Sequence, residues 1–379
     1  MLKVAIVGCG KIADSHASQI GRIKGCEIVA VCDQEPLMAR QLSDRFPVKR
    51  CFSDLGELLS ETAPDVVHIT TPPASHFDIA KACLEHGSHV YVEKPFTVNA
   101  EQAQILVALA NDRQLKLTVG HDDQFSHVAR RMRDLILSGY LGGPPVHMAS
   151  TFCYELGQTY AHALFGDRQH WVRTLPGKLL HNIISHGVAR MAPFLAGDAP
   201  EVIAYGFTGP LLRDLGETEI IDELRVMICD ERQTTAYFTF STQMRPSIHQ
   251  FALFGPKNGL LLDQDHEILL KLRGAHFKSY LEKFVPPAIF ARQHLANLAL
   301  NIGIFLARDF HPKAGMRYLI ESFYRAITDG TPVPIPYREI ILTTTIMDRI
   351  FQQLACAQPP AQTAVDKHAA PLVANSSHA

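Results

Sequence analysis

The feature that most constrains the fold is a glycine-rich turn that follows an apolar, β-branched run near the start of the chain. Residues 4–7 (Val-Ala-Ile-Val) lead directly into Gly8-Cys9-Gly10-Lys11-Ile12-Ala13. This pattern predicts a buried parallel strand that turns tightly into a helix. Gly8 permits the sharp turn, Gly10 permits close approach of a pyrophosphate, and Ala13 permits tight packing of helix on strand. The turn therefore predicts a dinucleotide-binding site.

A second apolar run, residues 26–32, ends in Asp33, 20 residues beyond Ala13. A carboxylate at this distance from the turn is suited to accept hydrogen bonds from the ribose hydroxyls. Neither Gln34 nor Glu35 is cationic, and a carboxylate repels a 2′-phosphate. The segment therefore favours NAD over NADP. The nearest cation that could instead reach a 2′-phosphate is Arg40, about two helical turns further along the chain.

The order of the predicted elements indicates two domains. Strands alternate with helices up to residue 120, which predicts an α/β Rossmann domain with a doubly wound parallel sheet over residues 1–120. Strand-like runs then follow with few helices, which predicts an α+β domain with an open, mostly antiparallel sheet over residues 121–355. These runs cover residues 146–152, 202–207, 223–228, 234–241, 249–254 and 259–262. Residues 356–379 are poor in large apolar side chains and are predicted to be a disordered tail.

Composition excludes several classes of protein. With 379 residues and 47% hydrophobic content, the chain can fill two cores, and a net charge of −2 gives no basis for binding nucleic acid. The eight cysteines form no C-x-x-C pair and are expected to be reduced. No signal peptide or membrane span is predicted, so we expect a cytoplasmic protein.

Residues 281–310 predict an amphipathic helix. The apolar side chains at helical spacing are Ile289, Phe290, Leu295, Leu298, Ile302, Phe305 and Leu306, and the polar ones on another face are Gln293, Asn297, Asn301 and Arg308. We interpret the segment as a helix that packs on the sheet or at a subunit interface. A membrane-surface helix is the alternative, which the scarcity of lysine disfavours.

The glycine-rich turn, Asp33 and three further motifs together resemble the pattern of the Gfo/Idh/MocA oxidoreductases, and the resemblance extends from residue 2 to about residue 354. These motifs are Thr70-Thr71-Pro72 with His76, Glu93-Lys94-Pro95, and the segment 175–186 that ends in His186. The resemblance implies NAD(P)-dependent oxidation or reduction of a hydroxyl or keto carbon on a sugar, a cyclitol or a nucleotide-linked sugar. It also implies a small-molecule carbohydrate partner. Because an open sheet must bury its uncovered face, we further expect a homodimer or homotetramer.

The resemblance also implies the roles of individual residues. It assigns Lys94 to orienting and polarising the substrate hydroxyl, and His186 to general acid/base catalysis. Pro72 and His76 are expected to line the nicotinamide pocket. The full predicted cofactor-binding set is Gly8, Gly10, Lys11, Ile12, Asp33, Thr70, Thr71, Pro72, His76, Glu93 and Lys94.

Two departures from the family pattern concern the substrate region. Asn182 stands where the family carries an aspartate, four residues before His186, and an amide cannot act as a base. We therefore expect Asn182, which completes the predicted catalytic set with Lys94 and His186, to bind a substrate hydroxyl or to position His186. Proton transfer would then rest on Lys94 and His186 alone, or with a contribution from His181. His121-Asp122-Asp123 replaces the family's aromatic-Asn-Arg pattern. The predicted substrate-binding set is Lys94, His121, Asp123, His181, Asn182 and His186.

Three alternatives stay open at this point. His121, Asp123, His181 and His186 offer oxygen and imidazole ligands, although no metal is predicted. A redox-neutral enzyme would hold NAD tightly and use it for transient oxidation during elimination, hydrolysis or epimerisation. A dinucleotide-sensing regulator would keep the fold without catalysis, and the presence of both Lys94 and His186 disfavours it.

Overall fold

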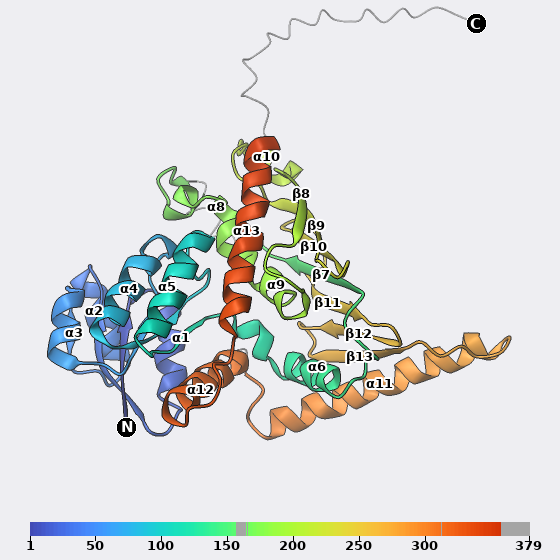
Figure 1. Cartoon of the computed structure of the whole chain (residues 1–379), viewed down its shortest axis with the longest axis horizontal. Coiled ribbons are helices and arrows are strands. Elements are labelled where there is room, and N and C mark those ends of the chain that lie inside the picture. Colours follow the sequence, from blue (N-terminus) through green and yellow to red (C-terminus); the bar gives the residue numbers. More distant parts are fainter. Residues whose placement is uncertain (157–163, 165, 312, 358–379) are drawn as a thin grey trace, which may run out of the picture.

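The computed structural model describes residues 1–156, 164, 166–311 and 313–357, arranged around two sheets (Figure 1). The first sheet is six-stranded and parallel, in the order β3-β2-β1-β4-β5-β6. Its strands are β1 (Leu2–Val7), β2 (Cys26–Cys32), β3 (Cys51–Phe52), β4 (Val66–Ile69), β5 (His89–Val92) and β6 (Leu117–Val119). The helices between them are α1 (Lys11–Ile20), α2 (Pro36–Arg45), α3 (Leu55–Thr62), α4 (His76–His86) and α5 (Ala100–Asp112).

This arrangement confirms the predicted parallel α/β sheet. The buried side chains of β1 and β4 form the centre of the first core. The chain runs outward from β1 to β2 on one side and from β4 to β5 on the other, so the strand order reverses between β1 and β4. The carboxyl ends of these two strands lead into Gly8 and Thr70. Ligands bind at such a switch point in open parallel sheets.

The second sheet is seven-stranded, in the order β13-β12-β11-β7-β10-β9-β8. Its strands are β7 (His147–Cys153), β8 (Glu201–Phe207), β9 (Glu223–Cys229), β10 (Thr235–Ser241), β11 (His249–Phe254), β12 (Asn258–Asp263) and β13 (Ile268–Arg273). Among these described strands only the pair β7–β10 is parallel, which confirms an open, mostly antiparallel sheet. The sequence did not predict β13, because its leucines do not alternate cleanly with polar residues.

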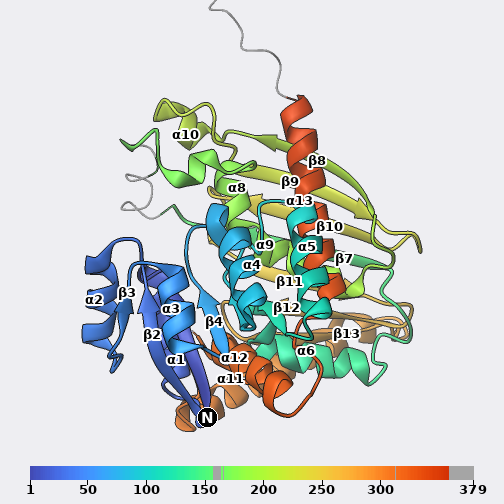
Figure 2. The same ribbon diagram turned by 60° about the vertical axis from the view of Figure 1, so that its left-hand side comes forward.

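The helices of the second half are α6 (His127–Leu137), α8 (Lys178–Ile183), α9 (Ser185–Ala189), α10 (Pro210–Asp214), α11 (Leu281–Leu306), α12 (Ala314–Thr328) and α13 (Tyr337–Ala357). Phe323 and Tyr324 of α12 pack into the first core, so the chain returns to the N-terminal domain after the second sheet. Helix α13 contacts both α5 and β8 and runs between the two sheets (Figure 2). The domain boundary at residue 120 stays a prediction.

The helix predicted after residue 281 is present, but its packing differs from the expectation. Helix α11 lies along the edge strand β13 and projects past the sheet (Figure 1). Its polar residue Asn297 is 3% exposed, whereas Leu295 and Phe305 are 66% and 67% exposed. The polar face therefore packs on the protein and the apolar face is exposed.

Two further expectations concern the ends of the chain and the membrane. Helix α13 continues to Ala357, and the rest of the predicted tail lies outside the described residues. In the described part of the chain, no helix is both long enough and apolar enough to cross a bilayer.

Candidate active site

The glycine-rich turn has the shape of a nucleotide cradle. Gly8 has φ +92°, and a Cβ there would lie 2.6 Å from the amide nitrogen of Thr71, so only glycine fits. A Cβ on Gly10 would have no atom within 4 Å. Gly10 directly precedes α1, whose N-terminus attracts negative charge. The turn thus leaves room for a pyrophosphate beside the helix N-terminus.

Asp33 lies beside this turn. One carboxylate oxygen accepts a hydrogen bond from Cys9 N at 2.6 Å, and the other accepts one from Glu35 N at 2.9 Å. Across the turn, the hydroxyl of Thr70 donates to the carbonyl oxygen of Val7 at 3.1 Å. These contacts hold a carboxylate at the edge of the cradle, where it can accept ribose hydroxyls. The residues therefore fit a dinucleotide.

The remaining predicted cofactor residues surround the cradle to different degrees. Lys11 is exposed and Ile12 half-buried in the first turn of α1, and Pro72 is exposed after β4. His76 is fully buried, with its ring nitrogens 2.8 Å from Thr71 O and 2.9 Å from Pro95 O. Through these contacts His76 holds two loops together, and its place in the nicotinamide pocket stays a prediction.

Lys94 lies two residues after β5, at the carboxyl edge of the first sheet. It lines a cavity of about 640 Å³ between the two halves of the chain. Its ammonium donates a hydrogen bond to the carbonyl oxygen of Asn182 at 3.0 Å. Burial lowers the pKa of Lys94, while the neighbouring carboxylate of Glu93 raises it. The cavity thus has one cation fixed against its wall.

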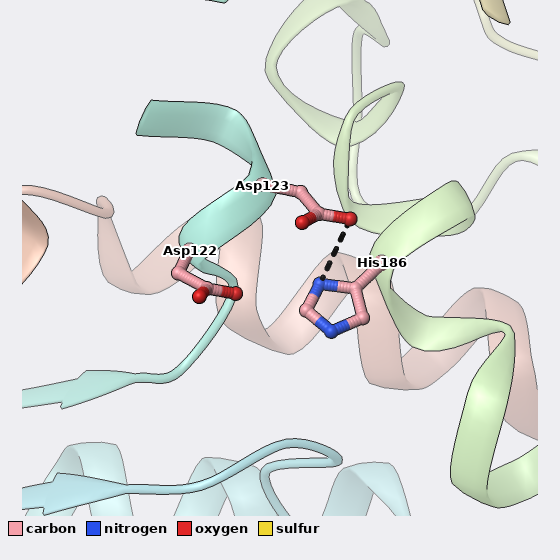
Figure 3. Close-up of side chains that lie close together, drawn as sticks. All are labelled: Asp122, Asp123 and His186. Atoms are coloured by element: carbon pink, nitrogen blue, oxygen red, sulfur yellow. Dashed lines mark ion pairs between the residues drawn. The ribbon is translucent and has the colours of Figure 1, made fainter. Parts of the chain in front are cut away.

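His186 and two adjacent acids face the same cavity (Figure 3). The Nδ1 atom of His186 lies 3.6 Å from an oxygen of Asp123, and a guanidinium nitrogen of Arg190 lies 3.9 Å from the same oxygen. Asp122 was not in the predicted substrate set. A short 3₁₀ helix, Asp122–Phe125, brings both neighbouring carboxylates to the cavity, which a list of single positions does not reveal.

The pKa values of His186, Asp122 and Asp123 in the cavity differ from their ordinary values in water. Burial lowers the pKa of His186 to about 4, so the imidazole is neutral near pH 7. Burial, assisted by the charge of Asp123, raises the pKa of Asp122 to about 7. Burial would also raise the pKa of Asp123, but His186 and Arg190 lower it below its ordinary value. The cavity therefore holds a neutral base beside a carboxylate.

The sequence predicted one helical face for residues 182–186, and the structure divides this segment. Helix α8 ends at Ile183 and α9 begins at Ser185. Asn182 still lines the cavity with His186. His181, from the same segment, is 1% exposed and its ring stacks on Phe351 with centroids 5.0 Å apart. His181 is not among the described residues that line this cavity, and its role in substrate binding stays a prediction.

His121 lies behind the cavity wall. It is 2% exposed, and its ring centroid is 6.0 Å from that of His186. Burial lowers the pKa of His121 to about 3, so this ring is neutral as well. The ring of His121 packs against that of His186, and its direct contact with substrate stays a prediction.

Several residues that line the cavity were not predicted from the sequence. His249 and Asp265 lie on the second-sheet side, where Nδ1 of His249 is 2.7 Å from the carboxylate of Asp265. Phe310 and His311, just after α11, form another part of the wall. They come from three separate segments of the second half, and no local motif marks them.

A metal-ligand set also exists in the described residues. The ligand atoms of Asp122, Asp123 and His186 all lie within 4.8 Å of one another. This set replaces His121 and His181 of the sequence-based alternative with Asp122. Lys94 and Arg190 already bring positive charge to the two acids, which favours a site that works without a metal ion.

Comparison with known proteins agrees with the fold and the cradle. Residues 2–121 match the family model described as an oxidoreductase family with an NAD-binding Rossmann fold. The chain is 32% identical over 142 residues to the D-glucoside 3-dehydrogenase of Escherichia coli, covering 37% of this chain and 40% of that protein. It is 24% identical over 216 residues to the 4-carboxy-2-hydroxymuconate-6-semialdehyde dehydrogenase of Sphingobium sp., covering 57% of this chain and 65% of that protein. The chain thus matches less than two thirds of the length of each of these two relatives.

Solved structures extend the likeness in fold to the second half. The WlbA dehydrogenase from Bordetella pertussis, in complex with NADH and UDP-GlcNAcA, superimposes with a TM-score of 0.74 at 16% identity, covering 94% of this chain and 96% of that one. The UDP-N-acetylglucosamine 3-dehydrogenase from Acidithiobacillus ferrooxidans superimposes with a TM-score of 0.68 at 18% identity, covering 92% and 97%. At these identities the likeness concerns the fold alone.

Proposed function

We propose that the chain, which belongs to the Gfo/Idh/MocA oxidoreductases through its residues 2–121, transfers a hydride between NAD and a hydroxyl or keto carbon of a carbohydrate. The observation that carries this proposal is that Lys94 and His186 line one cavity at the carboxyl edge of the parallel sheet. Alcohol oxidation needs a base for the hydroxyl proton and a cation for the developing oxyanion. These two side chains supply both.

Each residue has a distinct role in this proposal. His186, neutral near pH 7, accepts the hydroxyl proton, and the carboxylate of Asp123 stabilises the imidazolium that forms. The ammonium of Lys94 stabilises negative charge on the substrate oxygen, held in place by Asn182 O. NAD, when bound at the Gly8–Gly10 cradle, supplies or accepts the hydride. In the reverse direction, protonated His186 returns the proton.

The walls of the cavity favour a neutral, hydroxyl-rich substrate. Four acids line it: Asp122, Asp123, Asp265 and Glu267. Among the described lining residues they outnumber the one lysine, Lys94, so an anionic group would meet a net negative wall. Carboxylates and imidazoles accept or donate hydrogen bonds to sugar hydroxyls. Neutral sugars and cyclitols are therefore the class to screen before nucleotide-linked or acidic ones.

The test begins with fluorescence titrations of the purified protein with NADH and NADPH, after a check for nucleotide that co-purifies. A panel of sugars and cyclitols is then assayed for formation of reduced cofactor. We expect Lys94→Ala and His186→Ala to lower kcat/KM by about 10²- to 10⁴-fold each. Product formed without net cofactor reduction would instead indicate redox-neutral chemistry. Tight binding of NADH without turnover of any substrate would indicate a dinucleotide sensor.

A further inference from the structure

Helix α11 is attached to the protein through side-chain amides spaced four residues apart. Gln293 accepts from Lys271 N at 2.7 Å and donates to Lys271 O at 3.2 Å. Asn297 accepts from Leu269 N at 3.1 Å and donates to Leu269 O at 3.0 Å. Asn301 donates to a carbonyl of the turn before β13. The amides thus pair with the open edge of the second sheet, and this fixes which face of α11 points outward.

The outward face carries a seven-residue apolar repeat. One set of exposed positions, seven residues apart, is Leu281, Ala288, Leu295 and Ile302. A second exposed set, three residues after each of the first, is Phe284, Ala291, Leu298 and Phe305. The six large side chains among them are between 50% and 69% exposed. Alternating steps of three and four residues are typical of a seam that packs against one other helix.

The repeat is complementary to itself when two copies run antiparallel. With the two-fold axis at the level of residue 293, residue i of one helix faces residue 586 − i of the other. The resulting pairs are Leu281 with Phe305, Phe284 with Ile302, Ala288 with Leu298, and Ala291 with Leu295. Each alanine then faces a leucine, so small side chains oppose large ones over the middle of the seam, and large side chains oppose each other at its two ends.

From this pattern we propose that α11 forms an antiparallel pair with α11 of a second copy of the chain. At roughly 100 Å² for each of the six large side chains, the seam buries about 600 Å² per copy, or about 1,200 Å² in total. That area reaches the lower range of stable protein interfaces. A lipid surface fits less well, because such helices favour rows of lysine and arginine, and the cations of α11 are Lys283 and Arg292.

The proposed pair lies close to the candidate active site. Phe310 and His311, which line the cavity, follow α11 by a few residues. The carbonyl oxygen of Asp309 accepts a hydrogen bond from His127 of α6 at 3.2 Å. Pairing of α11 would therefore hold one wall of the cavity from outside.

The test is the mass of the full-length protein in sedimentation equilibrium. We expect Leu298→Glu to halve the mass relative to wild type, and Ala288→Lys to do the same. A mixture of the two variants should recover the wild-type mass, because the introduced glutamate of one copy then faces the introduced lysine of the other. The matched control is Leu300→Glu, at a leucine of α11 that is 47% exposed but lies outside the seam, which should keep the wild-type mass.

Other results would overturn the proposal. A monomeric wild type, or an unchanged mass in Leu298→Glu, excludes the pair. Failure of the mixture to recover the mass, with both variants showing wild-type circular dichroism, excludes the antiparallel register. Binding of wild type to phosphatidylcholine–phosphatidylglycerol vesicles, lost in Leu298→Glu without a change in mass, assigns the seam to a lipid surface. None of these measurements depends on the proposed enzymatic activity.

Discussion

The ring of His16 lies 2.9 Å from the carboxylate of Glu93, and this contact ends a buried chain of hydrogen bonds. Nδ1 of His16 lies 2.8 Å from Nδ1 of His68, whose Nε2 lies 2.9 Å from the hydroxyl of Tyr324. Burial would raise the pKa of Glu93, but His16 and Lys94 lower it to about 2, so Glu93 accepts. With one proton on each ring, every donor in the chain then points toward Glu93.

This directed chain predicts the effect of Glu93→Gln on Lys94. Burial lowers the pKa of Lys94 and the charge of Glu93 raises it, so removal of that charge lowers it further. The basic limb of the kcat/KM profile should therefore move to lower pH. The control is Tyr324→Phe, which removes the far donor without changing the charge beside Lys94. A basic limb that stays in place in Glu93→Gln would show that Glu93 does not support the charge on Lys94.

Local patterns were sufficient for the first half of the fold. The cradle, Asp33 and the parallel strands each leave a short sequence signature, because a strand, a turn and a helix that are contiguous in the chain build them. Helix α11 shows the limit of this reasoning. Its two faces were read from the sequence, but which face meets the protein depends on the open edge of β13, a partner that periodicity does not reveal.

In the candidate site too, residues within local motifs could be predicted, and residues brought together by packing could not. The motif around Lys94 and the position of His186 placed both at the cavity. His181 was a secondary candidate beside His186, and its ring stacks on Phe351. The opposite wall, with His249 and Asp265, depends on how the second sheet meets the first, which only three-dimensional packing decides.

Asp33→Asn should shift the cofactor preference toward NADPH. The carboxylate accepts ribose hydroxyls and repels a 2′-phosphate, and hydrogen bonds to charged groups contribute about 1.5–3 kcal/mol. The ratio of NADPH to NADH affinity should therefore rise about 10- to 100-fold, as measured by fluorescence titration. Glu35→Gln removes a neighbouring charge without removing the ribose contact and should change the ratio less. Equal effects of both variants would contradict the role of Asp33.

Asp122→Asn should change how stability depends on pH. The pKa of Asp122 is about 7 in the folded protein, against an ordinary value of 3.8. Between these values the folded state binds more protons than the unfolded state, so this group makes stability fall as pH rises. In urea unfolding, the variant should therefore gain stability relative to wild type at pH 8 compared with pH 5. Asp112→Asn, at an exposed position, should show no such difference.

Asn297→Leu should destabilise the protein by separating α11 from the sheet edge. Besides its two bonds to Leu269, the amide accepts from Arg131 at 2.8 Å and donates to Gln293 O at 2.8 Å. A buried backbone group left without a partner costs about 1–3 kcal/mol, and the change leaves two such groups on Leu269. The free energy of unfolding, measured in urea, should fall by at least that amount.

The matched control is Gln293→Leu, one turn earlier, where the backbone groups of Lys271 are exposed and water replaces the lost partner. A small and equal effect of both substitutions would mean that the amides do not decide which face of α11 is outward, and the exposed seam would then lose its structural basis.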